Sequence, residues 1–314
     1  MDPQPSSPHP VPLLPEGEGL RFAAVDVGSN ALRLLFTQVF DQEDEAVFRK
    51  VSLMRMPLRL GTEAFLNGAL SADTELRLLQ SLQGFTAMLK AWRPLRWRAC
   101  ATSALRSVHD SDELMERLNR GCGLGLECIT GEEEAGLILE NERNGAVARS
   151  RRCLFVDVGG GSTEVTFFGG GRDALSRSFP LGTVRLLHGQ GDAALWGALA
   201  EWLRSNRPRG SVLSIGSGGN INKLISMTGR PKRPTIGMEE IQTREREISA
   251  LSVTRRIREL GLRPDRADVL PHALRIYAFC MEHGGARRMM VPRAGLADGL
   301  IRKLYDDYRI DNPL

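Results

Sequence analysis

The stretch FAAVDVGSNALR at residues 22–33 decides the fold, because CLFVDVGGGSTE at residues 153–164 repeats its pattern 131 residues later. Each copy is a short apolar run followed by Asp-Val-Gly and then small residues. This pattern predicts a strand, a tight turn and a returning strand. Seven residues after the aspartates Asp26 and Asp157 stand Arg33 in the first copy and Glu164 in the second. We therefore expect two related halves that face each other across a cleft built for phosphate.

The rest of the chain predicts strands that alternate with helices. After the first strand pair, a third strand is expected at 47–54 and a turn at Leu60-Gly61. A long helix is expected from the N-cap Ser71 to before Pro94, with an apolar face that begins at Leu76 and continues through Leu79 and Leu82, and strands are expected at 95–101 and 126–129. In the second half, the hairpin at 153–168 is followed by a helix at 193–203, a strand at 212–215 and mostly helices from 239. Two tandem α/β halves follow, at 20–145 and 146–314. The final helix, about 298–310, is expected to return to the first half.

Composition excludes several classes of protein. The 314 residues are 42% hydrophobic, which suits a globular chain, and no apolar stretch reaches the roughly 18–20 residues that span a membrane. Residues 1–19 are rich in proline and predict a disordered tail rather than a signal peptide. Five scattered cysteines without zinc spacing indicate a reducing, cytoplasmic setting, and a net charge of +4 does not argue for nucleic acid.

Three Gly/Ser-rich turns follow apolar strands, at 28–30, 159–163 and 216–220. Phosphate binding needs such turns, since they offer backbone N–H groups and allow close approach. Asp26 and Asp157 end their strands, where a carboxylate suits a magnesium ion that bridges phosphate oxygens. Hydrogen bonding to their own turns is the structural alternative, and for Asp157, with Glu164 on the neighbouring strand, we favour the metal.

The helix that starts at Thr130 carries three glutamates in its first turn. Thr130 and Glu133 fit a capping box, which gives Glu133 a structural role. Glu134 shares a face with Leu137 and Ile138 and should point inward. Attraction to the helix N-terminus is the alternative for an acidic residue here, and the residues alone leave the two readings of Glu134 open.

Taken together, these motifs resemble the exopolyphosphatase/guanosine pentaphosphate phosphohydrolase (Ppx/GppA) family, within the actin, Hsp70 and sugar-kinase superfamily. The resemblance runs from about Phe22 to Leu304. It rests on VDVGSNALR at 25–33, ATSALR at 101–106, GEEEA at 131–135, DVGGGSTE at 157–164 and SIGSGG at 214–219. It implies an α/β fold of two tandem actin-like, ribonuclease H-like domains with an interdomain cleft.

The resemblance also implies an activity, the Mg²⁺-dependent release of terminal phosphate from inorganic polyphosphate or guanosine pentaphosphate (pppGpp). Glu134 matches the general base that activates water, and Asp157 and Glu164 match metal ligands, with Asp26 as a further candidate. Mn²⁺ could replace Mg²⁺, a monovalent cation is a further candidate, and a homodimer is typical of the family. The residues expected to contact phosphate are Gly28, Ser29, Asn30, Arg33, Thr102, Ser103, Arg106, Gly159, Gly160, Gly161, Ser162, Thr163, Gly216, Gly218 and Gly219.

Two segments depart from the family pattern. RSVHD stands at 106–110 where the family often has Arg-Asp-Ala-x-Asn, and Ala297 replaces a usual arginine. From the resemblance we expect no counterpart of the helical C-terminal domains that help longer members bind long polymers, and the choice between polyphosphate and pppGpp stays open. Two alternatives also remain: an ATP-binding kinase or ATPase of the same superfamily, and a non-catalytic sensor that binds an alarmone.

Overall fold

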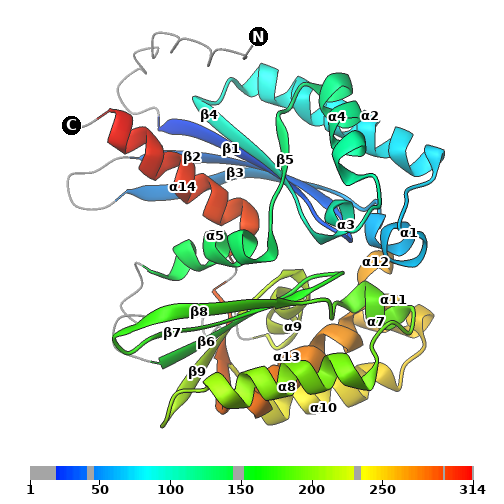
Figure 1. Ribbon diagram of the computed structural model, residues 1–314, viewed down its shortest axis with the longest axis vertical. Coiled ribbons are helices and arrows are strands. Elements are labelled where there is room, and N and C mark those ends of the chain that lie inside the picture. Colours follow the sequence, from blue (N-terminus) through cyan, green and yellow to red (C-terminus); the bar gives the residue numbers. More distant parts are fainter. Residues whose placement is uncertain (1–18, 41–45, 144–151, 230–234, 293, 313–314) are drawn as a thin grey trace.

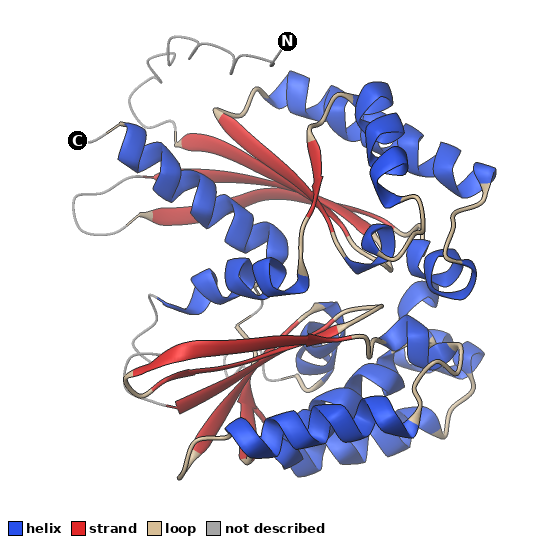
Figure 2. Ribbon diagram, in the orientation of Figure 1, coloured by secondary structure: helices blue, strands red, loops and turns tan. Residues whose placement is uncertain are grey.

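The structure is a computed structural model that describes residues 19–40, 46–143, 152–229, 235–292 and 294–312. It contains two β-sheets, one above the other in Figure 1, each with helices against it (Figure 2). The predicted tail at 1–19, apart from Gly19, and the predicted boundary at 145/146 lie outside the described residues. None of the helices in the described ranges is both long and apolar enough to cross a lipid bilayer.

The first sheet has the strand order β3-β2-β1-β4-β5. β1, β2 and β3 form an antiparallel meander, and β4 and β5 run parallel to β1. The central residues 22–25 of β1 are all apolar because both faces of the strand are covered there: Phe22 and Ala24 enter one hydrophobic core while Ala23 and Val25 enter another. The bounds are β1 Leu20–Val27, β2 Leu32–Phe40, β3 Val47–Met56, β4 Arg96–Ala101 and β5 Leu126–Cys128.

The second sheet repeats this arrangement in the order β8-β7-β6-β9-β11, with β10 added antiparallel at the β11 edge. β6, β7 and β8 form the meander, and β9 and β11 are parallel to β6. The predicted fold class is confirmed: the chain is α/β, with two tandem actin-like, ribonuclease H-like domains. The bounds are β6 Arg152–Val158, β7 Thr163–Gly169, β8 Arg172–Phe179, β9 Val212–Ser217, β10 Thr235–Gly237 and β11 Ala286–Met290.

Helices cover the outer faces of both sheets, and two of them lie between the halves. α14 packs on β1, β2 and β4 of the first sheet and on α5 (Figure 1, red and green). Close contact of these two helices needs Gly299, since a Cβ there would lie 1.9 Å from the Leu137 carbonyl oxygen. The bounds are α1 Leu60–Asn67, α2 Ala72–Trp92, α3 Ser103–Arg106, α4 Ser111–Cys122, α5 Gly131–Arg143, α7 Thr183–Leu187, α8 Ala193–Asn206, α9 Gly219–Met227, α10 Met238–Ser249, α11 Val253–Leu260, α12 Pro264–Ala267, α13 Leu270–Gly284 and α14 Leu296–Asp311.

Several local expectations need correction. Ser71 caps α2 as predicted, but Leu76, expected on the buried face, is 52% exposed, and Leu78 is buried instead. The turn expected at Leu60-Gly61 is the first turn of α1, and the chain turns one residue earlier, at Arg59, which is left-handed with φ 52°. β8, β10 and β11 were not predicted; β8 is an edge strand of largely exposed residues, so it lacks the alternation that marks a half-buried strand.

Candidate active site

The two hairpins place the aspartate and the residue seven positions later directly opposite each other. In the first hairpin Asp26 pairs with Arg33, and in the second Asp157 pairs with Glu164. The first pair is an ion pair, with Arg33 Nη1 2.5 Å from Asp26 Oδ2. Burial lowers the pKa of Arg33, but the Asp26 carboxylate outweighs it and the net shift is upward. The first hairpin is thus internally neutralised, whereas the second sets two carboxylates side by side.

Asp157 and Glu164 are both buried, with 8% and 1% of their surface exposed. Burial raises the pKa of Asp157 to about 6. Burial, together with the charge of Asp157, raises the pKa of Glu164 to about 7. The hydroxyls of Ser162 and Ser178 donate to Glu164 Oε1 at 2.6 and 2.9 Å and offset part of this rise. Two such carboxyl groups favour a proton or a cation between them.

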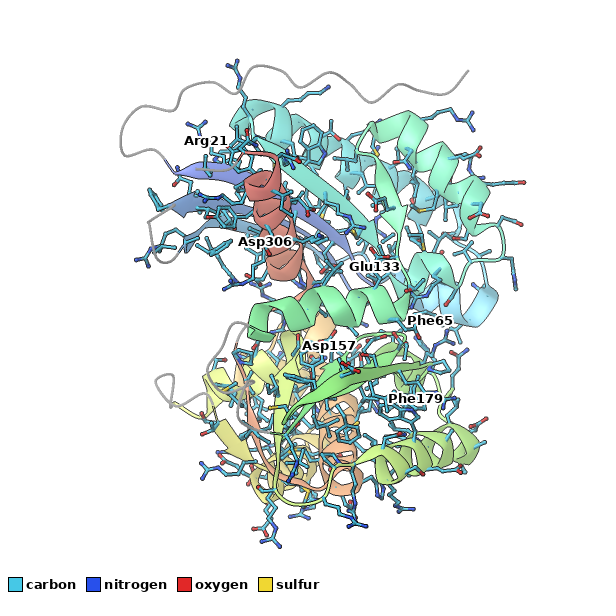
Figure 3. The ribbon with its side chains drawn as sticks, turned by 60° about the vertical axis from the view of Figure 1, so that its left-hand side comes forward. Arg21, Phe65, Glu133, Asp157, Phe179 and Asp306 are labelled. Atoms are coloured by element: carbon cyan, nitrogen blue, oxygen red, sulfur yellow. The ribbon has the colours of Figure 1, made fainter. Side chains whose placement is uncertain are left out.

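Glu134 points into the same region from the first turn of α5. Thr130 Oγ1 accepts a 3.1 Å hydrogen bond from the Glu133 N–H, and the Glu133 carboxylate lies 2.7 Å from Arg98, so Glu133 has the structural role predicted for it. Glu134 Oε2, in contrast, is buried and has no hydrogen-bond partner among the described residues. Burial, followed by the charges of Glu164 and Asp157, raises the pKa of Glu134 well above its usual value. Figure 3 shows α5 between the two halves, with Asp157 just below it.

A cleft of about 680 Å³ opens between the halves at this point. Glu134, Asp26 and Asp157 line it. So do most of the residues predicted to contact phosphate, namely Gly28, Ser29, Asn30, Arg33, Thr102, Ser103, Gly159, Gly160, Ser162, Gly218 and Gly219. The turns approach closely, since a Cβ on Gly160 would lie 2.7 Å from the Ser29 Cβ. The cleft therefore brings the three Gly/Ser-rich turns to one place.

The remaining predicted residues support the cleft without lining it. The Thr163 hydroxyl donates to the Leu181 carbonyl at 2.5 Å. The Gly161 carbonyl accepts a 2.9 Å bond from Arg185 Nε, and Gly216 leaves room for Met289. Glu164 lies behind the cleft wall.

Arg106 also stands outside the lining. Its Nη1 donates to the carbonyl of Ile129, just before α5, at 2.5 Å. From there its charge lowers the pKa of Glu134 and of Glu164. Arg106 therefore acts on the carboxylates in this structure, where contact with phosphate was expected. Asn30 is similarly engaged, because its Nδ2 donates to the Asp265 carbonyl at 2.9 Å across the halves.

Sequence reasoning missed five cations that line the cleft: Lys50, Arg55, Lys223, Arg263 and Arg266. Arg266, from α12, lies beside Gly219. A Cβ built on Gly219 would lie 2.9 Å from Arg266 Nη2 and 3.8 Å from Arg33 Nη2, so the two guanidinium groups face the same glycine. Burial and the adjacent Arg55 and Arg33 charges lower the pKa of Arg266 to about 10. Gathered cations of this kind favour an anionic ligand. No sequence motif predicted these five cations, because they come from segments far apart in the chain.

The predicted set of metal ligands is only partly supported. The described residues contain no group of three or more His, Cys, Asp or Glu side chains placed to hold a metal ion, and Asp26 is drawn to Arg33 instead of to Asp157 and Glu164. Asp157 Oδ1 and Glu134 Oε2 are nevertheless buried and lack partners among the described residues. Unpaired carboxylate oxygens are what Mg²⁺ or Mn²⁺ takes as ligands, with water and phosphate completing the shell. Asp157 and Glu134 thus offer unpaired oxygens that suit a divalent cation, whereas the Asp26 carboxylate is paired with Arg33, and the ligand set itself stays a prediction.

Fold and site together define a protein of two actin-like domains that enclose a cleft of buried carboxylates, Gly-rich turns and arginines. The model of the Ppx/GppA phosphatase family matches residues 39–190 of this chain. It is 26% identical to the guanosine-5'-triphosphate,3'-diphosphate pyrophosphatase of Vibrio atlanticus over 307 residues, which cover 92% of this chain and 60% of that protein. The chain thus spans about three fifths of the length of the curated relatives it matches.

Solved structures share the fold. The Aquifex aeolicus member of the Ppx/GppA family superposes with a TM-score of 0.72 at 23% identity, covering 94% of this chain and 99% of that one. An exopolyphosphatase from Cytophaga hutchinsonii gives a TM-score of 0.76 at 19% identity, covering 91% of this chain and 98% of that one. Both likenesses extend over the two domains and the cleft between them.

Proposed function

We propose that this chain is a phosphoanhydride hydrolase that releases terminal phosphate from pppGpp or inorganic polyphosphate with the help of Mg²⁺ or Mn²⁺. The observation that carries the proposal is Glu134, a half-buried residue that lines the cleft with Asp157 and whose buried Oε2 atom has no partner among the described residues. Two of the similar proteins, a guanosine-5'-triphosphate,3'-diphosphate pyrophosphatase and an exopolyphosphatase, bear names that agree with this chemistry.

In the proposed mechanism Glu134 accepts a proton from the attacking water. Its raised pKa suits a general base that works near neutral pH. The backbone N–H groups of the Gly28 and Gly159 turns and the Arg33 and Arg266 guanidinium groups bind and orient the phosphate chain. Charge neutralisation is the main need, because phosphoryl transfer requires little covalent help from the protein.

Asp157 and Glu164 would hold the divalent cation. When bound, it supplies positive charge to the phosphate oxygens and to the carboxylates that otherwise repel each other. Ser162 and Ser178 keep the Glu164 carboxylate oriented through their hydrogen bonds to Oε1. Arg106 restrains the start of α5 and moderates the pKa of Glu134, so it helps to keep that carboxylate available as a base.

The test is a phosphate-release assay with Glu134→Gln, which keeps the size of the side chain and removes its basicity. We expect turnover to fall by roughly 10²–10⁴-fold, with an unchanged melting curve. Glu132→Gln, the same change at an exposed glutamate of the same helical turn, is the matched control and should retain activity. Near-wild-type turnover in Glu134→Gln would sink the assignment.

The same assay with different substrates separates the alternatives. Short polyphosphate, long polyphosphate, pppGpp and ATP are compared at equal phosphate concentration. Release from polyphosphate or pppGpp but not from ATP supports the proposal. Transfer from ATP to an acceptor would indicate a kinase, and tight pppGpp binding without release would indicate a sensor.

A further inference from the structure

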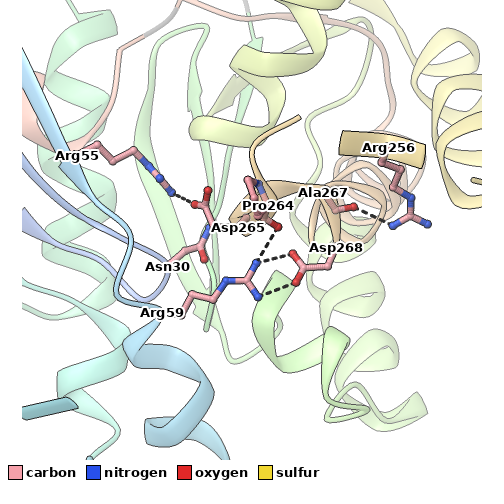
Figure 4. Close-up of polar contacts among 8 residues, drawn as sticks. All are labelled: Asn30, Arg55, Arg59, Arg256, Pro264, Asp265, Ala267 and Asp268. Atoms are coloured by element: carbon pink, nitrogen blue, oxygen red, sulfur yellow. Dashed lines mark hydrogen bonds and ion pairs between the residues drawn. The ribbon is translucent and has the colours of Figure 1, made fainter. Parts of the chain in front are cut away.

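Three side chains of the first domain form hydrogen bonds and ion pairs with the short helix α12 of the second domain and with Asp268, which follows it (Figure 4). Arg59 binds Asp268 through two parallel hydrogen bonds of 2.6 and 2.7 Å and also donates to the Pro264 carbonyl. Arg55 forms an ion pair with the Asp265 carboxylate, and Asn30 donates to the Asp265 carbonyl. These contacts join residues more than 200 positions apart in sequence.

Arg59 is the most constrained of the three. It adopts a left-handed conformation, φ 52° and ψ 42°, immediately before α1, which residues with a Cβ take only at some cost in free energy. The planar guanidinium meets the Asp268 carboxylate in a bidentate geometry, the strongest form of this interaction. Both side chains are largely shielded, with 30% and 18% exposed, so solvent weakens the pair less than it would at a fully exposed site.

These interdomain contacts fix the position of Arg266. It lies within α12, between Asp265 and Asp268, and its guanidinium reaches the cleft beside Gly219. Neighbouring cations repel it there, so without restraint it would favour a position farther from Arg33 and Arg55. On the other side Arg256 donates to the Ala267 carbonyl at 2.9 Å, which anchors the end of α12 to its own domain.

We propose that the Arg59–Asp268 pair is an interdomain latch, in which Arg59 is a positioning residue that holds α12 so that Arg266 stands in the cleft, ready for the phosphate chain. The pair couples the relative position of the two domains to the strength of phosphate binding. The binding part of this inference rests on the proposed function, whereas the restraint of α12 does not.

The restraint is tested by hydrogen–deuterium exchange of peptides that cover residues 261–270, in the metal-free protein. The variants are Arg59→Asn, Asp268→Asn and the exchanged pair Arg59→Asp/Asp268→Arg. Asn and Asp are chosen at position 59 because they tolerate the left-handed conformation. Arg93→Asn is the matched control, since within the described ranges Arg93 is the other non-glycine residue with positive φ, 53°, and it is exposed at the end of α2.

We expect roughly tenfold faster exchange of the Arg266 and Ala267 amides in either single variant, near-wild-type exchange in the exchanged pair, and no change in Arg93→Asn. Unchanged exchange in Arg59→Asn would overturn the latch. Equal acceleration in Arg93→Asn would overturn it too, because the effect would then follow from the backbone conformation rather than from the ion pair.

The link to binding is tested with inorganic tripolyphosphate, titrated by calorimetry into the Glu134→Gln protein with Mg²⁺ present. We expect Arg59→Asn and Arg266→Gln each to raise Kd roughly tenfold, and the double variant to bind no more weakly than Arg266→Gln alone. Arg59→Lys, which keeps the charge but not the bidentate geometry, should fall between wild type and Arg59→Asn. In the active enzyme, KM should rise in Arg59→Asn while kcat stays within about twofold.

Additive losses in the double variant would contradict action through Arg266. If no protein binds tripolyphosphate or pppGpp, the proposed function fails, and the exchange measurement still decides the restraint of α12 by itself. The two ideas can therefore fail separately.

Discussion

Neutralising Glu164 should stabilise the metal-free protein at alkaline pH, although the same change removes a proposed metal ligand. Glu164→Gln keeps the side-chain shape and leaves an oxygen to accept the hydrogen bonds of Ser162 and Ser178. The Glu164 carboxylate lies buried opposite Asp157 on the neighbouring strand. Its ionised form is therefore disfavoured in the folded state, and the amide is not.

The sign and size of this stabilisation follow from the linkage between proton binding and folding. The pKa of Glu164 is raised from 4.5 to about 7 in the folded protein. Between these values the folded state holds a proton that the unfolded state has released, so the stability contributed by this group falls as pH rises. A rise from 4.5 to about 7 corresponds to about 3 kcal/mol of unfolding free energy, lost completely above pH 7. Glutamine carries no such loss at any pH.

The assay is urea unfolding in EDTA at pH 5, 6, 7 and 8. The free energy of unfolding of Glu164→Gln minus that of wild type should be below about 1 kcal/mol at pH 5 and approach about 3 kcal/mol at pH 8. Glu132→Gln, at an exposed site, should show no comparable gain at pH 8. A difference that is flat across this range, or that is largest at pH 5, would refute the account of the second hairpin.

Two further predictions concern metal and packing. At pH 8, Mg²⁺ at about 100 times its Kd should stabilise the wild type by about 2.7 kcal/mol. Thermal unfolding measures this effect, and an equal rise in Tm on adding Mg²⁺ to wild type and to Glu164→Gln would contradict the ligand assignment. Gly299→Ala should destabilise the protein by about 3 kcal/mol, because its Cβ would meet the Leu137 carbonyl at 1.9 Å. Gly136→Ala, on α5 with nothing within 4 Å of a Cβ, should instead stabilise it by up to about 1 kcal/mol, and a similar fall in Tm for both would argue against the clash.

Much of the arrangement of the two β-hairpins could be predicted, because it depends on residues that lie close together in the sequence. The apolar runs before Asp26 and Asp157, and the small residues after them, specify a strand and a turn wherever they occur. Opposite pairing of each aspartate with the residue seven positions on is a consequence of a four-residue connection between antiparallel strands. The inward direction of Glu134 likewise follows from helical periodicity.

What could not be predicted depends on distant segments. Arg59, Arg266 and Asp268 look like ordinary surface charges in the sequence, and only the folded chain pairs Arg59 with Asp268 and places Arg266 at the cleft. The buried face of α2 was assigned through Leu76, while packing selects Leu78, because both registers offer leucines at helical spacing. The motif around Asp26 matches that around Asp157, and only the paired strands show that Asp26 faces a cation, Arg33, where Asp157 faces a carboxylate.

The position of α14 has a consequence for how this chain matures during synthesis. The face of the first sheet that carries Phe22 and Leu35 is covered by residues of α14, such as Leu300 and Tyr305, which leave the ribosome some 265 residues later. Until then that apolar face has no permanent cover, so the first domain to be translated is among the last to be completed. A nascent chain halted before Leu296 should therefore present a hydrophobic surface to chaperones, even though every strand of both sheets has already been made.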